Sequence, residues 1–128
     1  MIKNSIKYGH YNCLLCGDNN PWSLGLDYKL LDDGRVFTLF KGNKSLQGYK
    51  GILHGGVISA LLDSAMVHCL FNHDIEAVTA EMTIRFMESI PYNTPLKLYG
   101  LWGTYVSQMA ESPVFYIGNF PMTFSYSC

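Results

Sequence analysis

The chain has 128 residues, of which 48% are hydrophobic and 15% are charged, and its formal net charge is −1. This length and apolar content fit one domain with a buried core, over residues 1–128, and exclude a disordered chain. Nine basic residues stand against ten acidic ones, so no cationic excess supports nucleic-acid binding. No apolar run reaches the roughly 20 residues of a membrane span, and the first residues lack the apolar stretch of a signal peptide. We therefore expect a cytoplasmic protein with no membrane partner.

The first third of the chain predicts a loop followed by a β-hairpin. Residues 10–23 are rich in turn formers, and residues 24–30 alternate between apolar and polar side chains with the period of a half-buried strand. Asp32-Asp33-Gly34 is typical of a hairpin turn, and residues 35–41 predict the returning strand. Residues 42–53 hold three glycines and few strand formers, so we expect a loop there.

The main helix is predicted over residues 56–72. Its apolar side chains fall on nearly every face, which is typical of a helix surrounded by protein. Four strands are predicted after it, over residues 78–86, 96–102, 114–117 and 122–126. One apolar helix between two groups of antiparallel strands indicates an α+β fold in which the sheet wraps around the helix.

His54-Gly55-Gly56 stands immediately before the predicted helix. Two glycines at a helix N-terminus leave the backbone N–H groups unshielded, with the positive end of the helix dipole behind them. Such an end binds phosphate, carboxylate or a developing oxyanion. A tight turn that needs unusual φ angles explains two glycines equally well, so the motif alone leaves both interpretations open.

Asp63 lies inside the predicted helix among apolar residues. Burying a carboxylate costs several kcal/mol unless a partner satisfies it, so Asp63 is either functional or bonded to a loop amide. It follows His54 by nine residues, which is about 2.5 helical turns and some 13 Å along the axis. The glycine amides and Asp63 of one helix therefore cannot act on one small group. If both act on one substrate, a twofold dimer must bring the two chains together.

Cys13 and Cys16 have the spacing of half a zinc site, which needs two further ligands. No second close pair follows in the sequence. The alternative is a structural turn in which Cys13 and Cys16 are two small buried side chains. We favour this alternative and therefore expect no metal. If the zinc site is real, the whole chain is a small zinc-stabilised interaction domain, which is one hypothesis for its function. The residues that could complete a metal site are His10, His68, Cys69 and Cys128.

Three stretches of the sequence resemble the hotdog-fold thioesterases of the PaaI (phenylacetate-degradation) type. They are residues 47–66, which hold His54 and Asp63, residues 77–86, and the Cys13–Leu26 segment. The resemblance covers about residues 12–102. It implies a hotdog fold, in which an antiparallel sheet wraps one long helix, and a homodimer or homotetramer that hydrolyses acyl-CoA thioesters at the dimer interface without a metal or cofactor.

The resemblance also implies roles for individual residues. The amide of Gly56, together with Gly55, would polarise the thioester carbonyl, and His54 would shape the turn. Asp63 of the partner subunit would activate water or attack the carbonyl directly. Where some relatives carry an Asn this chain has Gly48, and the neighbouring Gln47 would hold the carbonyl or the water instead. The residues themselves add Ser64 as a candidate to position water and Arg85 as a candidate contact of the CoA phosphates. Helical geometry places His68 about 140° around the helix from Asp63, which predicts a core or helix-end histidine and not a catalytic one.

The segment from Gly103 to Cys128 departs from the family pattern. It is short and aromatic, and its single charge is Glu111. This departure motivates a second hypothesis, a non-catalytic hotdog module that binds an acyl thioester or a partner protein. The sequence names neither the acyl chain nor the choice between dimer and tetramer.

Overall fold

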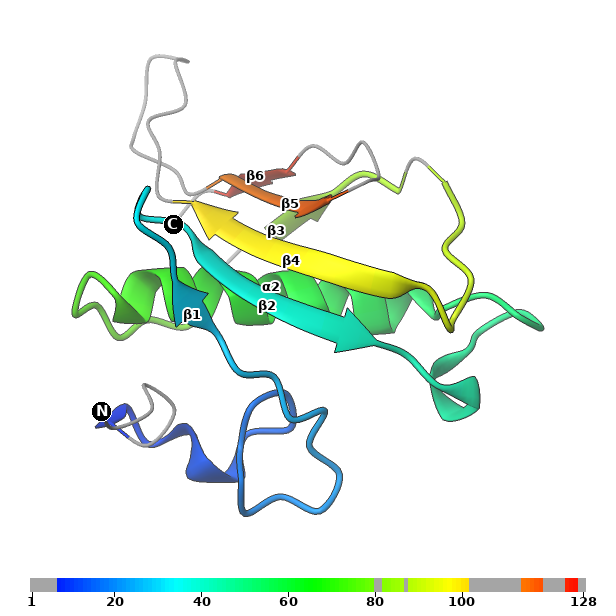
Figure 1. Cartoon of the computed structure of the whole chain (residues 1–128), viewed down its shortest axis with the longest axis horizontal. Coiled ribbons are helices and arrows are strands. Elements are labelled where there is room, and N and C mark those ends of the chain that lie inside the picture. Colours follow the sequence, from blue (N-terminus) through cyan, green and yellow to red (C-terminus); the bar gives the residue numbers. More distant parts are fainter. Residues whose placement is uncertain (1–6, 80–81, 87, 102–113, 119–123, 127–128) are drawn as a thin grey trace.

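The computed structural model describes residues 7–79, 82–86, 88–101, 114–118 and 124–126 (Figure 1). Two strands precede the helix and four follow it in this part of the chain, as the sequence patterns predict. In chain order the elements are β1 (Lys29–Leu30), β2 (Val36–Lys41), α2 (Gly55–Phe71), β3 (Met82–Ile84), β4 (Pro95–Leu101), β5 (Val114–Gly118) and β6 (Phe124–Tyr126), with short 3-10 helices at His10–Asn12 and Lys44–Leu46.

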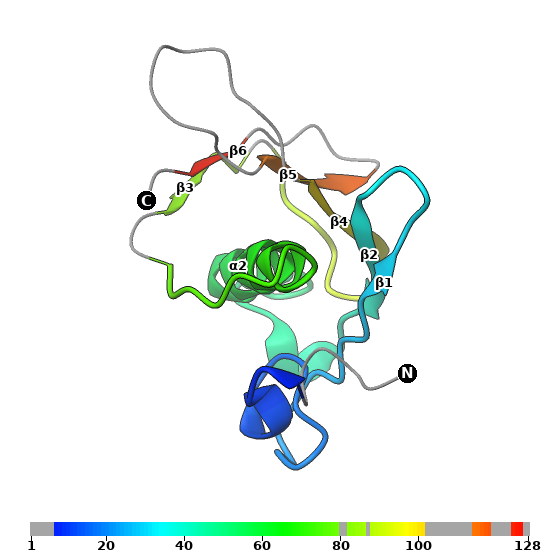
Figure 2. The same cartoon turned by 90° about the vertical axis from the view of Figure 1, so that its left-hand side faces the viewer.

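The strands form one antiparallel sheet in the order β1-β2-β4-β5 and a second, two-stranded sheet of β3 and β6. The longest ladder joins β2 to β4, from Val36 opposite Gly100 to Lys41 opposite Pro95. Figure 2 looks nearly along α2 and shows the strands curving around one side of the helix. The predicted α+β architecture, with a sheet wrapped around one helix, is confirmed.

Helix α2 supplies much of the core. Ten of its residues are buried, and they lie on several faces of the helix, as the sequence predicts. Leu61 and Ala65 of the helix belong to one hydrophobic cluster with Val36 of β2 and Leu98 of β4, and all four residues are fully buried. Burial of a large aliphatic side chain contributes about 1.5–3 kcal/mol. None of the described helices is long and apolar enough to cross a bilayer.

The first predicted strand is shorter in the structure than its alternating pattern indicates. Only Lys29 and Leu30 pair with β2, across the Asp32-Asp33-Gly34 turn, where Gly34 has a φ of 85°. Further upstream, the N–H groups of Leu24 and Leu26 donate to the carbonyls of Leu14 and Leu15 at 2.9 Å. The alternating segment therefore pairs with the N-terminal loop instead of with a strand.

The second half of the chain shows a similar shortening. The structure assigns β3 to Met82–Ile84, within the strand predicted over 78–86, and Val78 is 89% exposed. The strands β5 and β6 lie within or beside the two predicted near the C-terminus. Glu111, Cys128 and most of the atypical segment from Gly103 onwards lie outside the described residues.

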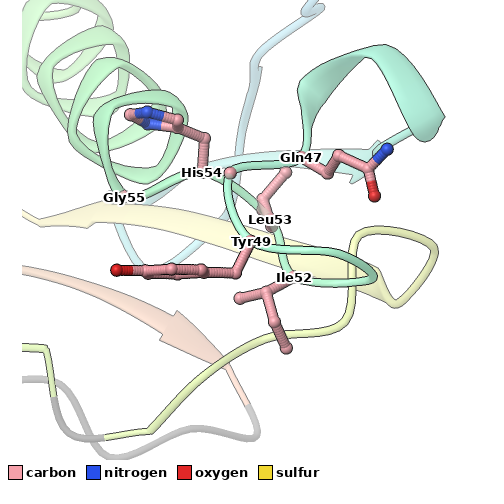
Figure 3. A pocket seen from close by; sticks show the side chains of 7 residues that line it. Gln47, Tyr49, Ile52, Leu53, His54 and Gly55 are labelled. Atoms are coloured by element: carbon pink, nitrogen blue, oxygen red, sulfur yellow. The ribbon is translucent and has the colours of Figure 1, made fainter.

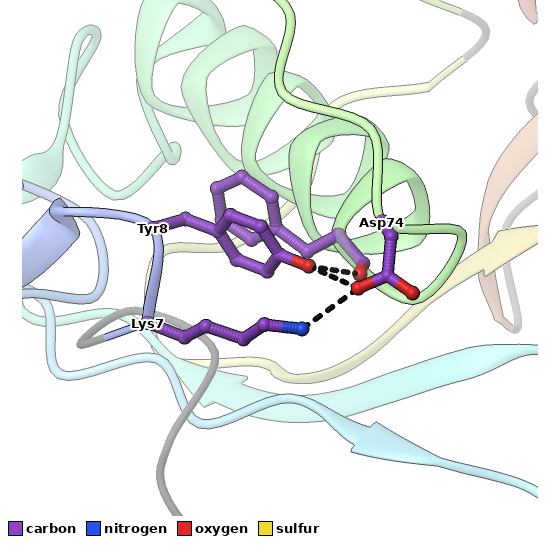
Figure 4. Close-up of polar contacts among 4 residues, drawn as sticks. Lys7, Tyr8 and Asp74 are labelled. Carbon is purple, nitrogen blue, oxygen red and sulfur yellow. Dashed lines mark hydrogen bonds and ion pairs between the residues drawn. The ribbon is translucent and has the colours of Figure 1, made fainter.

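The N-terminal segment packs against the C-terminal end of α2 (Figure 4). The Tyr8 ring stacks on Phe71 with centroids 4.4 Å apart, and its hydroxyl donates to Asp74 Oδ1 at 2.6 Å. Lys7 Nζ lies 2.7 Å from the same oxygen, and these two contacts lower the pKa of Asp74. Residues far apart in sequence are thus joined where the helix ends.

Candidate active site

His54 and the two glycines form the N-terminus of α2. His54 is the N-cap, and its Nδ1 accepts a 2.8 Å hydrogen bond from the Gly56 N–H. An accepting Nδ1 carries no proton, so the imidazole proton of neutral His54 lies on Nε2. Gly55 occupies the first helical position, where the N–H has no acceptor inside the helix. The structure thus gives the glycines different positions: Gly56 completes the cap, and Gly55 presents its amide.

An open pocket of about 590 Å³ lies in front of this helix end (Figure 3). Gln47 Oε1 accepts from the Gly51 N–H at 2.9 Å and closes the loop, and its side chain points away from the His54 ring. A Cβ on Gly48 would lie 3.2 Å from His54 Cδ2, so this glycine lets the loop approach the imidazole. The lining residues are Gln47, Gly48, Tyr49, Ile52, Leu53, His54 and Gly55, four of which the sequence analysis names as site residues.

A second pocket of about 330 Å³ shares Ile52, Leu53 and Gly55 with the first. Its other walls combine the apolar side chains of Phe86, Ile58 and Ile90 with the polar residues Glu88 and Ser89. A Cβ on Gly55 would lie 3.6 Å from the Phe86 ring, so Gly55 sits where the two pockets meet. Sequence reasoning missed Phe86 as a site residue, although its alternation pattern placed it on an apolar strand face.

Asp63 lies further along α2 and is half-buried. Its Oδ1 accepts a hydrogen bond from the Thr79 hydroxyl, which comes from the segment after the helix. Asp63 lines a small cavity of about 60 Å³ that shares no lining residue with the two pockets at the helix start. Within one chain, Asp63 and Gly55 therefore face different spaces, in agreement with their helical spacing. Thr79 was not singled out from the sequence, where it is one polar position in an alternating stretch.

Ser64 and Arg85 are not among the residues that line the pockets at the helix start. Ser64 is buried, and its Oγ donates to the Tyr28 hydroxyl at 3.0 Å. The Tyr28 hydroxyl in turn donates to the Leu61 carbonyl, and burial raises the pKa of Tyr28. Ser64 therefore ties α2 to the segment before β1. Arg85 follows β3 directly and is exposed.

His68 is a core histidine, as the sequence predicts. It is 5% exposed and stacks on the Tyr28 ring with centroids 4.4 Å apart. Burial, with a smaller contribution from nearby His10, lowers the pKa of His68 to about 4. No described residue offers its buried Nε2 a hydrogen-bond partner.

The helix start has the parts of an oxyanion site. A backbone N–H at the positive end of a helix dipole stabilises negative charge on an oxygen bound there. Both pockets are open to solvent, and Phe86 and Ile58 give the second an apolar wall for a hydrophobic group. The part still needed for hydrolysis, a base or nucleophile, is not supplied to these pockets by Asp63 of the same chain.

The model of the thioesterase superfamily matches residues 50–100. The bovine acyl-coenzyme A thioesterase THEM4 is 34% identical over 71 residues, which cover 53% of this chain and 29% of that protein. The chain thus spans less than a third of the curated relatives it matches.

Two solved structures share the fold. A thioesterase superfamily protein superposes with a TM-score of 0.78 at 22% identity, covering 91% of this chain and 59% of that one. The Escherichia coli PaaI protein from the phenylacetic acid degradation operon has a TM-score of 0.65 at 15% identity, covering 97% and 92%.

Proposed function

This chain belongs to the hotdog-fold thioesterase superfamily, and on that premise we propose that it hydrolyses acyl-CoA thioesters to the free acid and CoA. One observation carries the proposal. Gly55 presents a backbone N–H at the first position of α2, where two open pockets share a wall. A thioester carbonyl placed there has an amide donor, the apolar side chains of Phe86 and Ile58 on its acyl side and the first pocket open on its CoA side.

In the proposed reaction the Gly55 N–H donates to the carbonyl oxygen. Water adds to the carbonyl carbon, and the oxygen gains negative charge that the amide and the helix dipole stabilise. The carbon–sulfur bond then breaks, and the CoA thiolate leaves and takes a proton. His54 holds the Gly56 N–H and thereby keeps the first turn in the shape that presents Gly55.

Asp63 of the partner subunit acts on the other side of the carbonyl. It takes the proton of the attacking water or attacks the carbon itself, and both routes use an ionised carboxylate. The Thr79 hydroxyl donates to Oδ1 and holds the carboxylate, and in this scheme Oδ2 is the oxygen that reacts. Thr79 is therefore a positioning residue in this scheme.

The proposal needs a homodimer, alone or within a tetramer. Gly55 and Asp63 of one chain line separate cavities, and about 12 Å of helix separates their positions. A twofold axis that pairs the Gly55 end of one chain with Asp63 of another produces two equivalent sites. Exposed cations at Arg85, Lys44 and Lys50 are available to the CoA phosphates, while Gln47 and Gly48 shape the pocket.

The purified protein should be tested with aromatic and aliphatic acyl-CoAs of increasing length, with CoA release followed by a thiol reagent. Turnover that stops when Asp63 is replaced supports the proposal. Tight binding of acyl-CoA without release of CoA would instead identify a non-catalytic acyl-thioester-binding module.

The two-chain site has a separate test. Subunits carrying Asp63→Asn are mixed with subunits carrying Gly55→Pro, both inactive by design, and the dimers are dissociated and reassembled. Random reassembly forms one intact site in half of the dimers, so about a quarter of the parental activity should return. Mixtures that stay inactive while forming heterodimers would contradict a site shared between chains.

A further inference from the structure

We propose that His10, Cys13 and Cys16 bind a thiophilic divalent cation, zinc before others, in the N-terminal segment that covers α2. The ligand atoms of these three residues lie within 4.8 Å of one another, and Cys16 Sγ lies 3.8 Å from His10 Nδ1. Tetrahedral zinc, with bonds of about 2.0–2.3 Å, places neighbouring ligand atoms about 3.5 Å apart. The three ligand atoms therefore need to move about an ångström closer together to reach the distances of a zinc site.

The backbone around Cys13 is arranged as a tight knuckle. The Leu15 N–H donates to Cys13 Sγ at 3.3 Å, and the Gly17 N–H donates to the Cys13 carbonyl at 2.9 Å. Hydrogen bonds to sulfur stabilise the thiolate that a metal requires. A Cβ on Gly17 would lie only 2.4 Å from Cys13 N, so glycine is the residue that allows this turn. Both cysteines are thiols and do not form a disulfide.

A second observation comes from His68. This side chain is 5% exposed, and its Nε2 has no hydrogen-bond partner among the described residues. It lines the same cavity of about 60 Å³ as His10, Cys13 and Cys16. That volume holds about two water molecules. We assign the fourth coordination position to a water in this cavity, which gives His68 Nε2 the partner that it lacks.

The charge balance suits the surroundings. On binding, each thiol loses its proton to solvent, so two thiolates and a dication form a neutral unit with the imidazole of His10. Leu15 and Val67 give this small cavity apolar walls, which accept a neutral unit at less cost than a charged one, and Asp63 is the acidic side chain among its lining residues. Sulfur and imidazole ligands select zinc over magnesium or calcium, which prefer oxygen.

The site would fasten the N-terminal segment to α2. The Lys7 and Tyr8 contacts to Asp74 hold this segment at the last turn of the helix, and the His10 ring meets Phe71 edge-on at 4.9 Å. A metal at His10, Cys13 and Cys16 adds a second attachment at the level of His68. This role does not depend on the proposed thioesterase activity.

The test is the metal content of the whole chain, purified with a reductant and without a chelator from zinc-supplemented medium. We expect about one zinc per chain, and a value below about one tenth would overturn the proposal. His10→Ala, Cys13→Ser and Cys16→Ser should each lower the content at least tenfold. The matched controls are Cys69→Ala, a buried thiol outside the cluster, and His73→Ala, an exposed histidine.

A measurement on the unmodified chain covers the case in which these variants do not fold. The protein is stripped with a chelator and titrated with cobalt(II). Thiolate-to-cobalt charge-transfer absorption that saturates at one equivalent, together with the strong visible bands of a four-coordinate ion, supports the site. Absence of these bands in folded protein, or mass spectrometry showing that Cys13 and Cys16 form a disulfide in its place, would contradict it.

Discussion

The two ends of helix α2 have opposite surroundings. At its start, His54 and Gly56 are exposed, and pockets of about 590 and 330 Å³ meet at Gly55. At its end, Tyr8 stacks on Phe71, His68 is buried, and the adjacent cavity measures only about 60 Å³. The same helix is therefore open to ligands at one end and covered by its own N-terminal segment at the other.

This difference separates binding from anchoring along one element. The open end carries glycines, which leave room for a ligand beside the backbone, and the covered end carries rings, which fill space. Asp63 lies between them and lines the small cavity, so the chain places its carboxylate away from its own open pocket. The following predictions test whether the two ends do have separate roles.

The largest effect is expected from Asp63→Asn. The amide keeps the size of the side chain but loses the charge, so a general base disappears and kcat should fall about 10²–10⁴-fold. Asp33→Asn is the matched control, because it makes the same charge change in the exposed β1–β2 hairpin. Steady-state CoA release measures both. A parental rate in Asp63→Asn would remove this residue from the mechanism.

The next largest effect is expected from Gly55→Pro. Proline is tolerated at the first helical position, and His54, with φ −62° and ψ 133°, has the extended backbone that precedes proline. The substitution thus deletes the proposed oxyanion donor and spares the helix. We expect kcat to fall about 10²–10³-fold. Gly55→Ala, which keeps the N–H, is the control, and equal losses in both variants would contradict the amide's role.

A smaller effect is expected from Thr79→Ala. A hydrogen bond to a charged group is worth about 1.5–3 kcal/mol, which corresponds to roughly a 10- to 100-fold loss of kcat if the bond positions Asp63. KM should stay near its parental value, because Thr79 lines none of the described pockets at the helix start. Thr79→Ser, which restores the hydroxyl, should recover most of the rate. A purely structural role would instead lower thermal stability and leave kcat unchanged.

The smallest effect is expected from Asp74→Asn at the covered end. Lys7 and Tyr8 lower the pKa of Asp74, so its ionised form stabilises the fold above the ordinary carboxylate pKa. This contribution disappears as the pH falls through the lowered value, whereas the pKa of Lys7 is raised and adds stability up to alkaline pH. Because the pair is exposed, we expect the Tm of Asp74→Asn to lie about one degree or less below the Tm of the parent at each pH between about 5 and 9.

Thermal melts of the parent and of Asp74→Asn, recorded from pH 2 to 9, measure this difference. The two curves should converge at the acidic end, where Asp74 is protonated in both states. A constant gap at every pH would mean that the effect is not electrostatic.

Local patterns predicted the main elements well. The helix runs from Gly55 to Phe71, one residue earlier at each end than predicted, because its apolar run and glycine start are local signals. The hairpin turn at Gly34 is also local, since a positive φ at that position favours glycine. Residues 24–28 carry the alternation of a strand, but their backbone bonds go to Leu14 and Leu15, and no local pattern encodes that choice.

The candidate site was predicted only in part, for a similar reason. His54 and Gly55 follow from a motif, and the separation from Asp63 follows from helical geometry. The hydrogen bond from the Gly56 N–H to the His54 ring depends on the rotamer of His54, which the sequence does not specify. Thr79 reaches Asp63 because the chain turns back after the helix, and Phe86, which follows β3, lies beside Gly55.

The sequence by itself determined that one apolar helix lies inside an antiparallel sheet and begins at a pair of glycines, because side-chain periodicity and glycine placement act within a few residues. Only the tertiary structure decided which polar groups meet. It brought His10 to the two cysteines, Thr79 to Asp63 and Gly55 to two pockets. These encounters depend on packing across the core, where contacts between distant segments follow from the shape of the whole chain.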